Sequence, residues 1–456
     1  MAERFFNFKR EAEQTFKTDI VISTQMDAAI ALWQSIIAGN PPWLDDEDDI
    51  ETINFAKFIA QDMAKKVCLD IGISVAGSSR ATYLQGVVDE LLKVLRDKVE
   101  DVGCYGGMIL KPNGSEKAGN CIDYVMNGDF IVTETDNNGN VRGAIFPDRI
   151  QKGRKWYTRL EWQRYENGLY VISNRAFVSE YSNDIGRPIN IMNVPEWSHI
   201  ESDVYIENLD SPLFAYFKMP CNNTIDNRSP LGVPQYANAI KELKDLDIAW
   251  SRKGAEVEDS KHMTMVDISM VKQARERRIK LPRFIREYDP GTGNEDKVHE
   301  HTATMLTEQR IADINSILSM ISTKCGYSQG QFVLDRKTGT ITATQVESND
   351  QDTVRTIKDI RDSLKTAIKE LLYALNAYAD LYNLAPVGKY EPEFAFGDLE
   401  YSFEQDKLRH WQYVQAGKYP LYLYYVKFEG MSEAEAKKVV EEAAAEQKGE
   451  GLFKEE

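Results

Sequence analysis

Apolar side chains recur every three or four residues over roughly 40 residues, from Thr344 to about Leu384, which is the period of one face of an α-helix. The apolar positions are Ile357, Ile360, Leu364, Ile368, Leu371, Leu375, Tyr378 and Leu381. The opening residues Thr344 to Glu347 fit a capping box, which satisfies free amide donors at a helix start. At about 1.5 Å per residue the predicted helix is about 60 Å long. This exceeds the usual globular helix and indicates an elongated particle or a large assembly.

The segment before this helix, residues 326–341, reads GYSQGQFVLDRKTGTI. Its glycines, Gly326, Gly330 and Gly339, relax the backbone, so we expect the segment to take several conformations. Its polar side chains offer charges of both signs: Gln329, Gln331, Asp335, Arg336 and Lys337. Helices are predicted on both sides, and their converging ends would direct the loop to one place. A plain surface loop would have the same composition.

Three further helices are predicted between residues 26 and 103, each with one apolar face. Their stripes are Met26, Ala29, Ile30, Trp33 and Ile37; Phe55, Ile59, Met63 and Val67; and Leu84, Val87, Val88, Leu91, Leu95 and Val99. From residue 104 to 220 the pattern changes to strands. The sequences DNNGN (136–140) and ENG (166–168) each separate two strand-like runs, and Asn-Gly supplies the positive φ angles of a tight hairpin. The sequence thus predicts an α+β fold, mainly helical, with an antiparallel β region.

Two more long amphipathic helices are predicted at residues 234–262 and 307–325. Their apolar stripes are too long to be covered by one compact core, so we expect them to pack partly against neighbouring subunits. The candidate subunit-packing residues are Trp250, Ile311, Ile314 and Ile317.

The segment between these two helices, residues 264–300, is predicted to be irregular and is richly charged. Beyond Pro386 the sequence EPEFAFGDLEYSF is strand-like. Two or three short helices and a polar tail are predicted after it.

The composition limits the class of protein. The chain has 456 residues, 42% of them hydrophobic, which is enough for sizeable cores and about three domains. A net charge of −17 argues against a protein that coats nucleic acid with a basic surface, but not against one that surrounds nucleic acid without gripping it. Without a long apolar run or an apolar signal core, we expect a soluble protein, made and used in a cytoplasm, with no membrane contact. The five scattered cysteines indicate free thiols.

Motifs for catalysis or cofactor binding are absent, so we expect no enzyme, no cofactor and no metal site. The chain has no GxxxxGK[ST], HExxH or GxSxG motif, and no GxGxxG after a strand. Three weaker features have plainer explanations. The six acids of PPWLDDEDDIE (41–51) suit a solvated helix N-terminus. His299 and His301 suit a solvated pair in an acidic loop, and Cys325 has no histidine close in sequence.

One stretch, residues 272–286, stands out against the acidic background and reads KQARERRIKLPRFIR. Its single acid is Glu276, and its seven cationic residues are Lys272, Arg275, Arg277, Arg278, Lys280, Arg283 and Arg286. An ordinary solvated surface would explain this run, and so would contact with phosphates or with an acidic partner. Both explanations stay open.

Taken in order, several stretches resemble the portal proteins of long-tailed, siphovirus-like bacteriophages, over nearly the whole chain. They are SPLGVPQYANAIKELKDLD (229–247), CGYSQGQF (325–332), TGTITATQVESND (338–350) and FGDLEYSF (396–403). The TATQV step after a glycine-containing loop is the most specific of them. The basic run at 272–286 has no counterpart that can be matched residue by residue.

The resemblance implies a ring, twelve-fold in the virion, at one vertex of the capsid. Double-stranded DNA would enter through its channel during packaging and leave through it at infection. The implied partners are the terminase large subunit, the major capsid and scaffolding proteins, and a head–tail adaptor. Assembly would take place in the cytoplasm of the host bacterium.

By order along the chain, the resemblance also implies a set of domains. They are a wing (1–228), a first stem helix (229–262), a clip (263–306), a second stem helix (307–325), a tunnel loop (326–341), a long wing helix (342–390) and a crown (391–456). The polar side chains of the tunnel loop would line the DNA channel. The cationic side chains of the clip would contact the terminase, the adaptor or DNA.

Two other classes stay open. Another capsid connector, such as a head–tail adaptor, would also belong to a ring, although adaptors are usually far smaller. A metal-dependent nucleic-acid enzyme would combine the carboxylates at 45–51 with the basic run at 272–286, and it would need metal-dependent activity in the purified protein.

Overall fold

The computed structural model divides into two compact units, Met1–Phe396 and Gly397–Glu456, and each is treated by itself. The residues that the structure describes are 8–21, 23–44, 50–113, 121–259, 263–267, 285–288, 298–301, 306–334, 343–397, 403–416, 418–429, 431–433 and 435–440.

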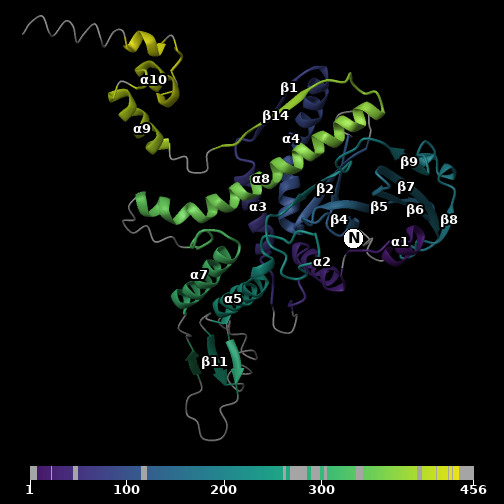
Figure 1. Ribbon diagram of the computed structural model, residues 1–456. Coiled ribbons are helices and arrows are strands. Elements are labelled where there is room, and N and C mark those ends of the chain that lie inside the picture. Colours follow the sequence, from purple (N-terminus) through teal and green to yellow (C-terminus); the bar gives the residue numbers. More distant parts are fainter. Residues whose placement is uncertain are drawn as a thin grey trace, which may run out of the picture. The chain divides into compact units, whose positions relative to one another are not determined.

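A large antiparallel sheet dominates the β region of the first unit (Figure 1). Its strands are β4 (Ile131–Thr135), β5 (Val141–Lys152), β6 (Lys155–Glu166), β7 (Leu169–Ser179) and β8 (Arg187–Ile189), with β9 (Asp203–Ile206) also paired to β7. The β4–β5 and β6–β7 turns are the two predicted from Asn-Gly. Asn167 and Gly168 both have positive φ, at 53° and 82°, as a tight hairpin turn requires. The predicted hairpins are therefore confirmed.

Helix α1 (Lys9–Phe16) covers one face of this sheet through a cluster of buried side chains. The cluster is Phe8, Ala12, Ile131, Ile145, Leu160, Phe177 and Ile185. Two short 3-10 helices, η3 (Ile191–Asn193) and η4 (Pro195–Trp197), pack at the β8 end, where Trp197 is buried against Ala176 and Val194.

The helical part is built on α2 (Thr24–Ile37), α3 (Phe55–Val67), α4 (Ser79–Tyr105) and α8 (Ala343–Leu381). It also holds a three-stranded sheet in the order β10 (Ala215–Lys218), β2 (Gly107–Pro112) and β3 (Ile122–Met126). The predicted apolar stripe of α8 is buried from Ile357 to Tyr378 within the chain itself, whereas Leu381 at the helix end is 45% exposed. The 39-residue helix is thus confirmed, and its apolar face is covered mainly by its own chain.

Residues 26–103 are not wholly helical, because a strand lies between α3 and α4. This strand, β1 (Gly72–Gly77), pairs antiparallel with β14 (Tyr390–Ala395), more than 300 residues away in sequence. The predicted strand after Pro386 is therefore confirmed as β14. It belongs to the first unit, so the sequence-based boundary at residue 391 falls inside a strand rather than between units.

The segment predicted as irregular between the second pair of helices contains three strands. Helix α5 (Ile240–Asp259, after the 3-10 helix η5, Ala237–Ala239) and helix α7 (Thr307–Lys324) bracket β11 (Met263–Asp267), β12 (Ile285–Tyr288) and β13 (Val298–His301). β11 is the central strand, parallel to β12 and antiparallel to β13. The prediction was wrong because the three strands are only four or five residues long and are separated by long connections.

The second unit holds the short helices α9 (Phe403–Gln415) and α10 (Leu421–Glu429), which were predicted after β14. They pack through aromatic rings, with His410 centred 4.9 Å from Tyr419 and 5.1 Å from Phe428, and with Trp411 5.2 Å from Tyr424. Among the described helices of the whole chain, none is both long and apolar enough to cross a membrane.

Candidate functional site

Helices α5 and α7 form an antiparallel pair that two ion pairs hold in register (Figure 1). Glu242 binds Lys324 at 2.6 Å, and Glu256 binds Arg310 at 2.8 Å. The two ion pairs are 14 residues apart on each helix, which is about four turns or two heptads. Buried apolar side chains lie on both helices: Leu243, Leu246, Ile314, Leu318 and Ile321. The pair is therefore one packed element.

The candidate subunit-packing residues differ in exposure. Ile314 is only 1% exposed, so it packs inside this chain and offers no surface to a neighbour. This corrects the expectation for Ile314, and the reason is that α5 covers that face of α7. Ile311 and Ile317 are half-buried, and Trp250 is 38% exposed with the Lys253 ammonium 4.7 Å from its ring. These three remain candidates for contact with another subunit.

The described part of the predicted loop, residues 326–334, is anchored, in contrast to the expectation of several conformations. Ser328 and Thr353 bind each other through both backbone N–H groups and both hydroxyls, at 2.9 to 3.3 Å. The Phe332 ring packs against Phe55 and Tyr327, with ring centres 5.4 and 5.2 Å apart. Residues 326–334 are therefore packed against α3 and α8.

The side chains predicted to line a channel fall in two groups. Gln329 is exposed and Gln331 is half-buried, whereas Asp335, Arg336 and Lys337 lie outside the described residues. Gly330 has φ +89°, so proline, whose φ is fixed near −65°, cannot replace it without breaking this turn.

Of the basic run, only Arg286 lies in the described part, on β12 opposite Met265. The other six cationic residues, from Lys272 to Arg283, lie outside the described residues, and so do the acids at 45–49. His299 and His301 lie on β13, two residues apart and therefore on the same face of the strand.

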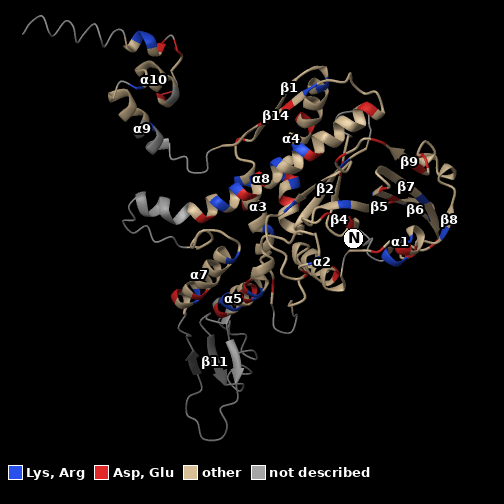
Figure 2. Ribbon diagram, viewed as in Figure 1, with Lys and Arg blue, Asp and Glu red and all other residues tan. Residues whose placement is uncertain are grey.

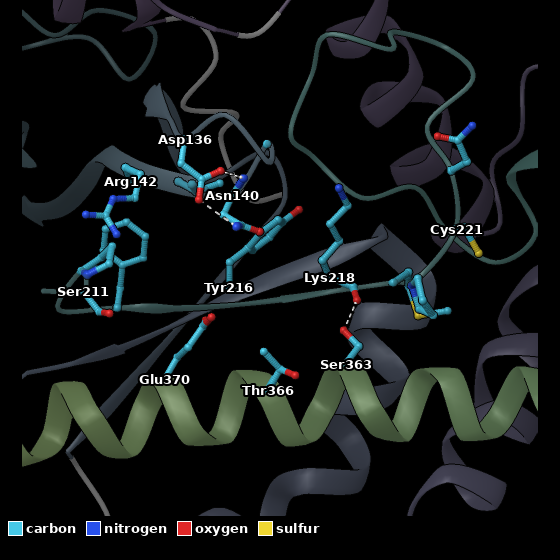
Figure 3. Close-up of a pocket in the computed structure, with 17 residues that line it drawn as sticks. Asp136, Asn140, Arg142, Ser211, Tyr216, Lys218, Cys221, Ser363, Thr366 and Glu370 are labelled. Carbon is cyan, nitrogen blue, oxygen red and sulfur yellow. Dashed lines mark hydrogen bonds between the residues drawn. The ribbon is translucent and has the colours of Figure 1, made fainter.

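The pocket in Figure 3 has a volume of about 710 Å³ and lies between β10, the β4–β5 turn and α8. Side chains of α8 bind the open edge of β10. The Ser363 hydroxyl donates to the Lys218 carbonyl at 2.6 Å, and the Tyr216 backbone N–H donates to the Glu370 carboxylate. Burial raises the pKa of Glu370. The helix thus covers an edge that could otherwise pair with another strand.

A second pocket, of about 460 Å³, borders a buried charge cluster between β2 and β6. The Lys111 ammonium lies 3.2 Å from both Glu161 oxygens, and Arg159 Nη1 donates to Glu161 at 3.0 Å. Burial alone would raise the pKa of Glu161, but Lys111, Arg159 and the Gln163 amide lower it to about 2. The cluster is internally compensated and acts as a structural element.

Burial raises the pKa of Asp129, in the β3–β4 turn, from 3.8 to about 6. A raised folded-state pKa stabilises the fold at low pH, and this contribution is lost as the pH rises through about 6. We therefore expect Asp129→Asn to increase the free energy of unfolding by up to about 3 kcal/mol at pH 7 to 8 and to change little near pH 4. Urea unfolding at both pH values tests this. Asp136→Asn is the control, because hydrogen bonds from Asn140 and Asn138 lower the pKa of Asp136, so this change should give no gain. An equal gain at both pH values would contradict the assignment.

The described part of the chain shows no activated nucleophile and no group of three or more His, Cys, Asp and Glu side chains that could hold a metal. All five cysteines are free, as the sequence indicated. Burial raises the pKa of the Cys68 thiol to about 11 and that of Cys104 to about 12, and it also raises the pKa of Cys325. Thiols with raised pKa values stay protonated and are poor nucleophiles.

No protein-family model matches this chain, and no curated protein matches it. Among solved structures, one similar chain belongs to the virion of a native gene transfer agent particle. The TM-score is 0.41 and the identity is 10%, with 85% of this chain and 89% of that chain covered. A likeness this distant carries no inference about function.

Proposed function

We propose that this chain is the portal subunit of a long-tailed bacteriophage, which forms a ring-shaped DNA channel at one capsid vertex. Twelve copies make the ring in the virion. The ring serves DNA packaging, head–tail joining and DNA ejection. Its partners are the terminase large subunit, the major capsid and scaffolding proteins, the head–tail adaptor and the DNA that passes through. It is assembled in the cytoplasm of the host bacterium.

The order and packing of three elements carry this proposal. An antiparallel helix pair, held in register at both ends, is followed in sequence by a packed segment at residues 326–334 and then by a single helix of 39 residues. The resemblance assigns these elements to the stem, the tunnel loop and the long wing helix. Such packed elements suit a subunit that must keep its shape while DNA moves past it.

The charge distribution also supports a conduit. The chain carries a net charge of −17, and acidic and basic residues both occur along the described parts of α5, α7 and α8 (Figure 2). A net acidic surface repels the phosphate backbone, so DNA slides instead of sticking. The sequence has no GxxxxGK[ST] motif, and we propose that the chain is not an enzyme and that a separate terminase supplies the ATPase.

Electron microscopy of the purified protein tests the proposal directly. Rings with a central hole are expected. A protein that stays a monomer at every concentration would contradict both the portal role and the other connector role.

A substitution on α7 tests which surface holds the ring together. We expect Ile317→Asp to abolish rings, because it places an unpaired charge at a half-buried position that a neighbouring subunit would cover. The monomer should keep its helix content by circular dichroism. Ser316→Asp, at the adjacent exposed position, should leave rings intact. Ile314→Asp should instead disrupt the α5–α7 pair within each chain. If light scattering shows that Ile317→Asp still forms rings of normal mass, α7 does not belong to the subunit interface.

A further inference from the structure

Lys218, at the end of β10, lies at the wall of the pocket in Figure 3 and has no acidic partner for its side chain among the described residues. Its ammonium extends away from α8, whereas Ser363, Thr366 and Glu370 extend from α8 towards β10 (Figure 3). Several other partly buried lysines have such a partner, among them Lys66 with Asp62, Lys98 with Asp101 and Lys365 with Asp362. The partly buried Lys253 instead lies over the Trp250 ring, whereas Lys218 has neither kind of contact within the described part of the chain.

The two carboxylates that line the same pocket are committed elsewhere. Asp136 accepts hydrogen bonds at 2.8 Å from the backbone N–H groups of Asn138 and Asn140 and from the Asn140 amide. Glu370 accepts from the Tyr216 backbone, and its pKa is raised by burial with no contribution from Lys218. The pKa of Lys218 is lowered by burial alone. A cation that loses water without gaining a counter-ion costs free energy, which an incoming anion would offset.

We propose that this pocket binds a carboxylate group, with the Lys218 ammonium as its counter-ion. The amide of Asn222, which also lines the pocket, can donate a hydrogen bond to the same group. The volume of about 710 Å³ accommodates an acidic side chain together with the backbone that carries it. No cavity-lining arginine competes for this role, because Arg142 donates to the Asp210 carbonyl at 3.3 Å and lies over the Tyr165 ring.

The carboxylate has two possible sources with the same chemistry. A second copy of this chain is one source, since the chain has 72 acidic against 55 basic residues, and this source rests on the proposed ring. A free organic acid, represented by citrate, is the other.

Trace acetylation with an amine-reactive ester, read by mass spectrometry, distinguishes these sources on the wild-type protein. Only the neutral amine reacts, so a bound carboxylate, which raises the pKa of Lys218 and covers it, should slow its acetylation roughly tenfold. Lys365 on α8, which pairs with Asp362, is the matched control and should not change. One arm compares the dissociated chain in citrate and in sodium chloride of equal ionic strength. The other compares dissociated and assembled protein.

Slowing by citrate but not by chloride supports the site with a free acid as ligand. Slower acetylation of Lys218 in the assembled protein supports the site with a second copy as the source, provided that the slowing becomes smaller in intact particles when salt rises from about 0.1 M to about 1 M. Equal acetylation in every state overturns the proposal. Protection on assembly that salt does not change, without an effect of citrate, means simple coverage and also overturns it. The citrate arm holds even if the chain forms no ring, so failure of the portal proposal would be seen separately.

Discussion

Replacing Arg80 with methionine is expected to lower the free energy of unfolding of the first unit by about 3–5 kcal/mol. Arg80 is the second residue of α4 and is 1% exposed. Its guanidinium donates to the Asn376, Ala385 and Pro386 carbonyls, to the Asn376 side chain and to the Asp380 carboxylate, at 2.6 to 3.1 Å. These acceptors belong to the last two turns of α8 and to the chain just after it. Without the arginine, carbonyls at a helix end would be buried with no donor.

Urea unfolding, followed by circular dichroism, measures this loss. Arg96→Met on an exposed position of the same helix is the matched control and should change stability little. Arg80→Lys keeps the charge but lacks the several donors of the guanidinium. Its loss of stability should therefore lie between those of Arg80→Met and Arg96→Met. If Arg80→Met costs no more than Arg96→Met, the guanidinium does not hold the end of α8.

Arg361 on α8 serves α3 in the same way. It is 6% exposed, and it donates to the carbonyls of Val67 and Lys66 at 3.1 and 2.9 Å, at the end of α3. The two arginines thus link α3 to α8 and α8 to α4 through helix C-termini, where the macrodipole favours a cation. This is how one long helix is fixed to elements far away in sequence.

The features that the sequence predicted well depend on local patterns. The apolar stripe of α8 repeats over many turns, and the Asn-Gly turns need only a few adjacent residues, so both can be read from the chain. The pairing of β1 with β14 and the role of Arg80 cannot, because their partners lie about 300 residues away. A single arginine at a helix start looks like an ordinary solvated residue until the acceptors around it are known.

The candidate site shows the same limit. Residues 326–334 have the glycine and polar content of a flexible loop. In the structure, however, Ser328 binds Thr353 on α8, and Phe332 packs against Phe55 on α3. Composition does not separate an anchored connection from a mobile one, because the contacts that anchor it are tertiary. Lys218 was missed for a related reason. Lys218 is recognised because no acidic side chain among the described residues pairs with its ammonium in the folded chain, and the spacing of residues in the sequence does not show this.

Lys111→Met is expected to destabilise the first unit by about 3–5 kcal/mol at pH 7, because it removes the cation that binds both oxygens of the buried Glu161 carboxylate. Arg159 and Gln163 still bind Glu161, which sets the lower end of this range. Lys111→Met combined with Glu161→Leu should recover most of the loss, since replacing a buried ion pair by apolar side chains is often close to neutral. If the loss of stability in the double variant equals the sum of the losses in the two single variants, the two residues are not coupled.

The pH dependence gives a second, independent readout of the same pair. In the wild type the folded-state pKa of Glu161 is lowered from 4.5 to about 2, so its stabilising contribution is complete above about pH 4.5 and is lost as the pH falls towards 2. Removing Lys111 raises that pKa, and Glu161 can then take up a proton in the folded state. The loss caused by Lys111→Met should therefore shrink as the pH is lowered from 7 towards 5, while the wild type hardly changes over that interval. Urea unfolding at a series of pH values measures this, and a loss that is constant with pH would mean that Lys111 acts through packing and not through its charge.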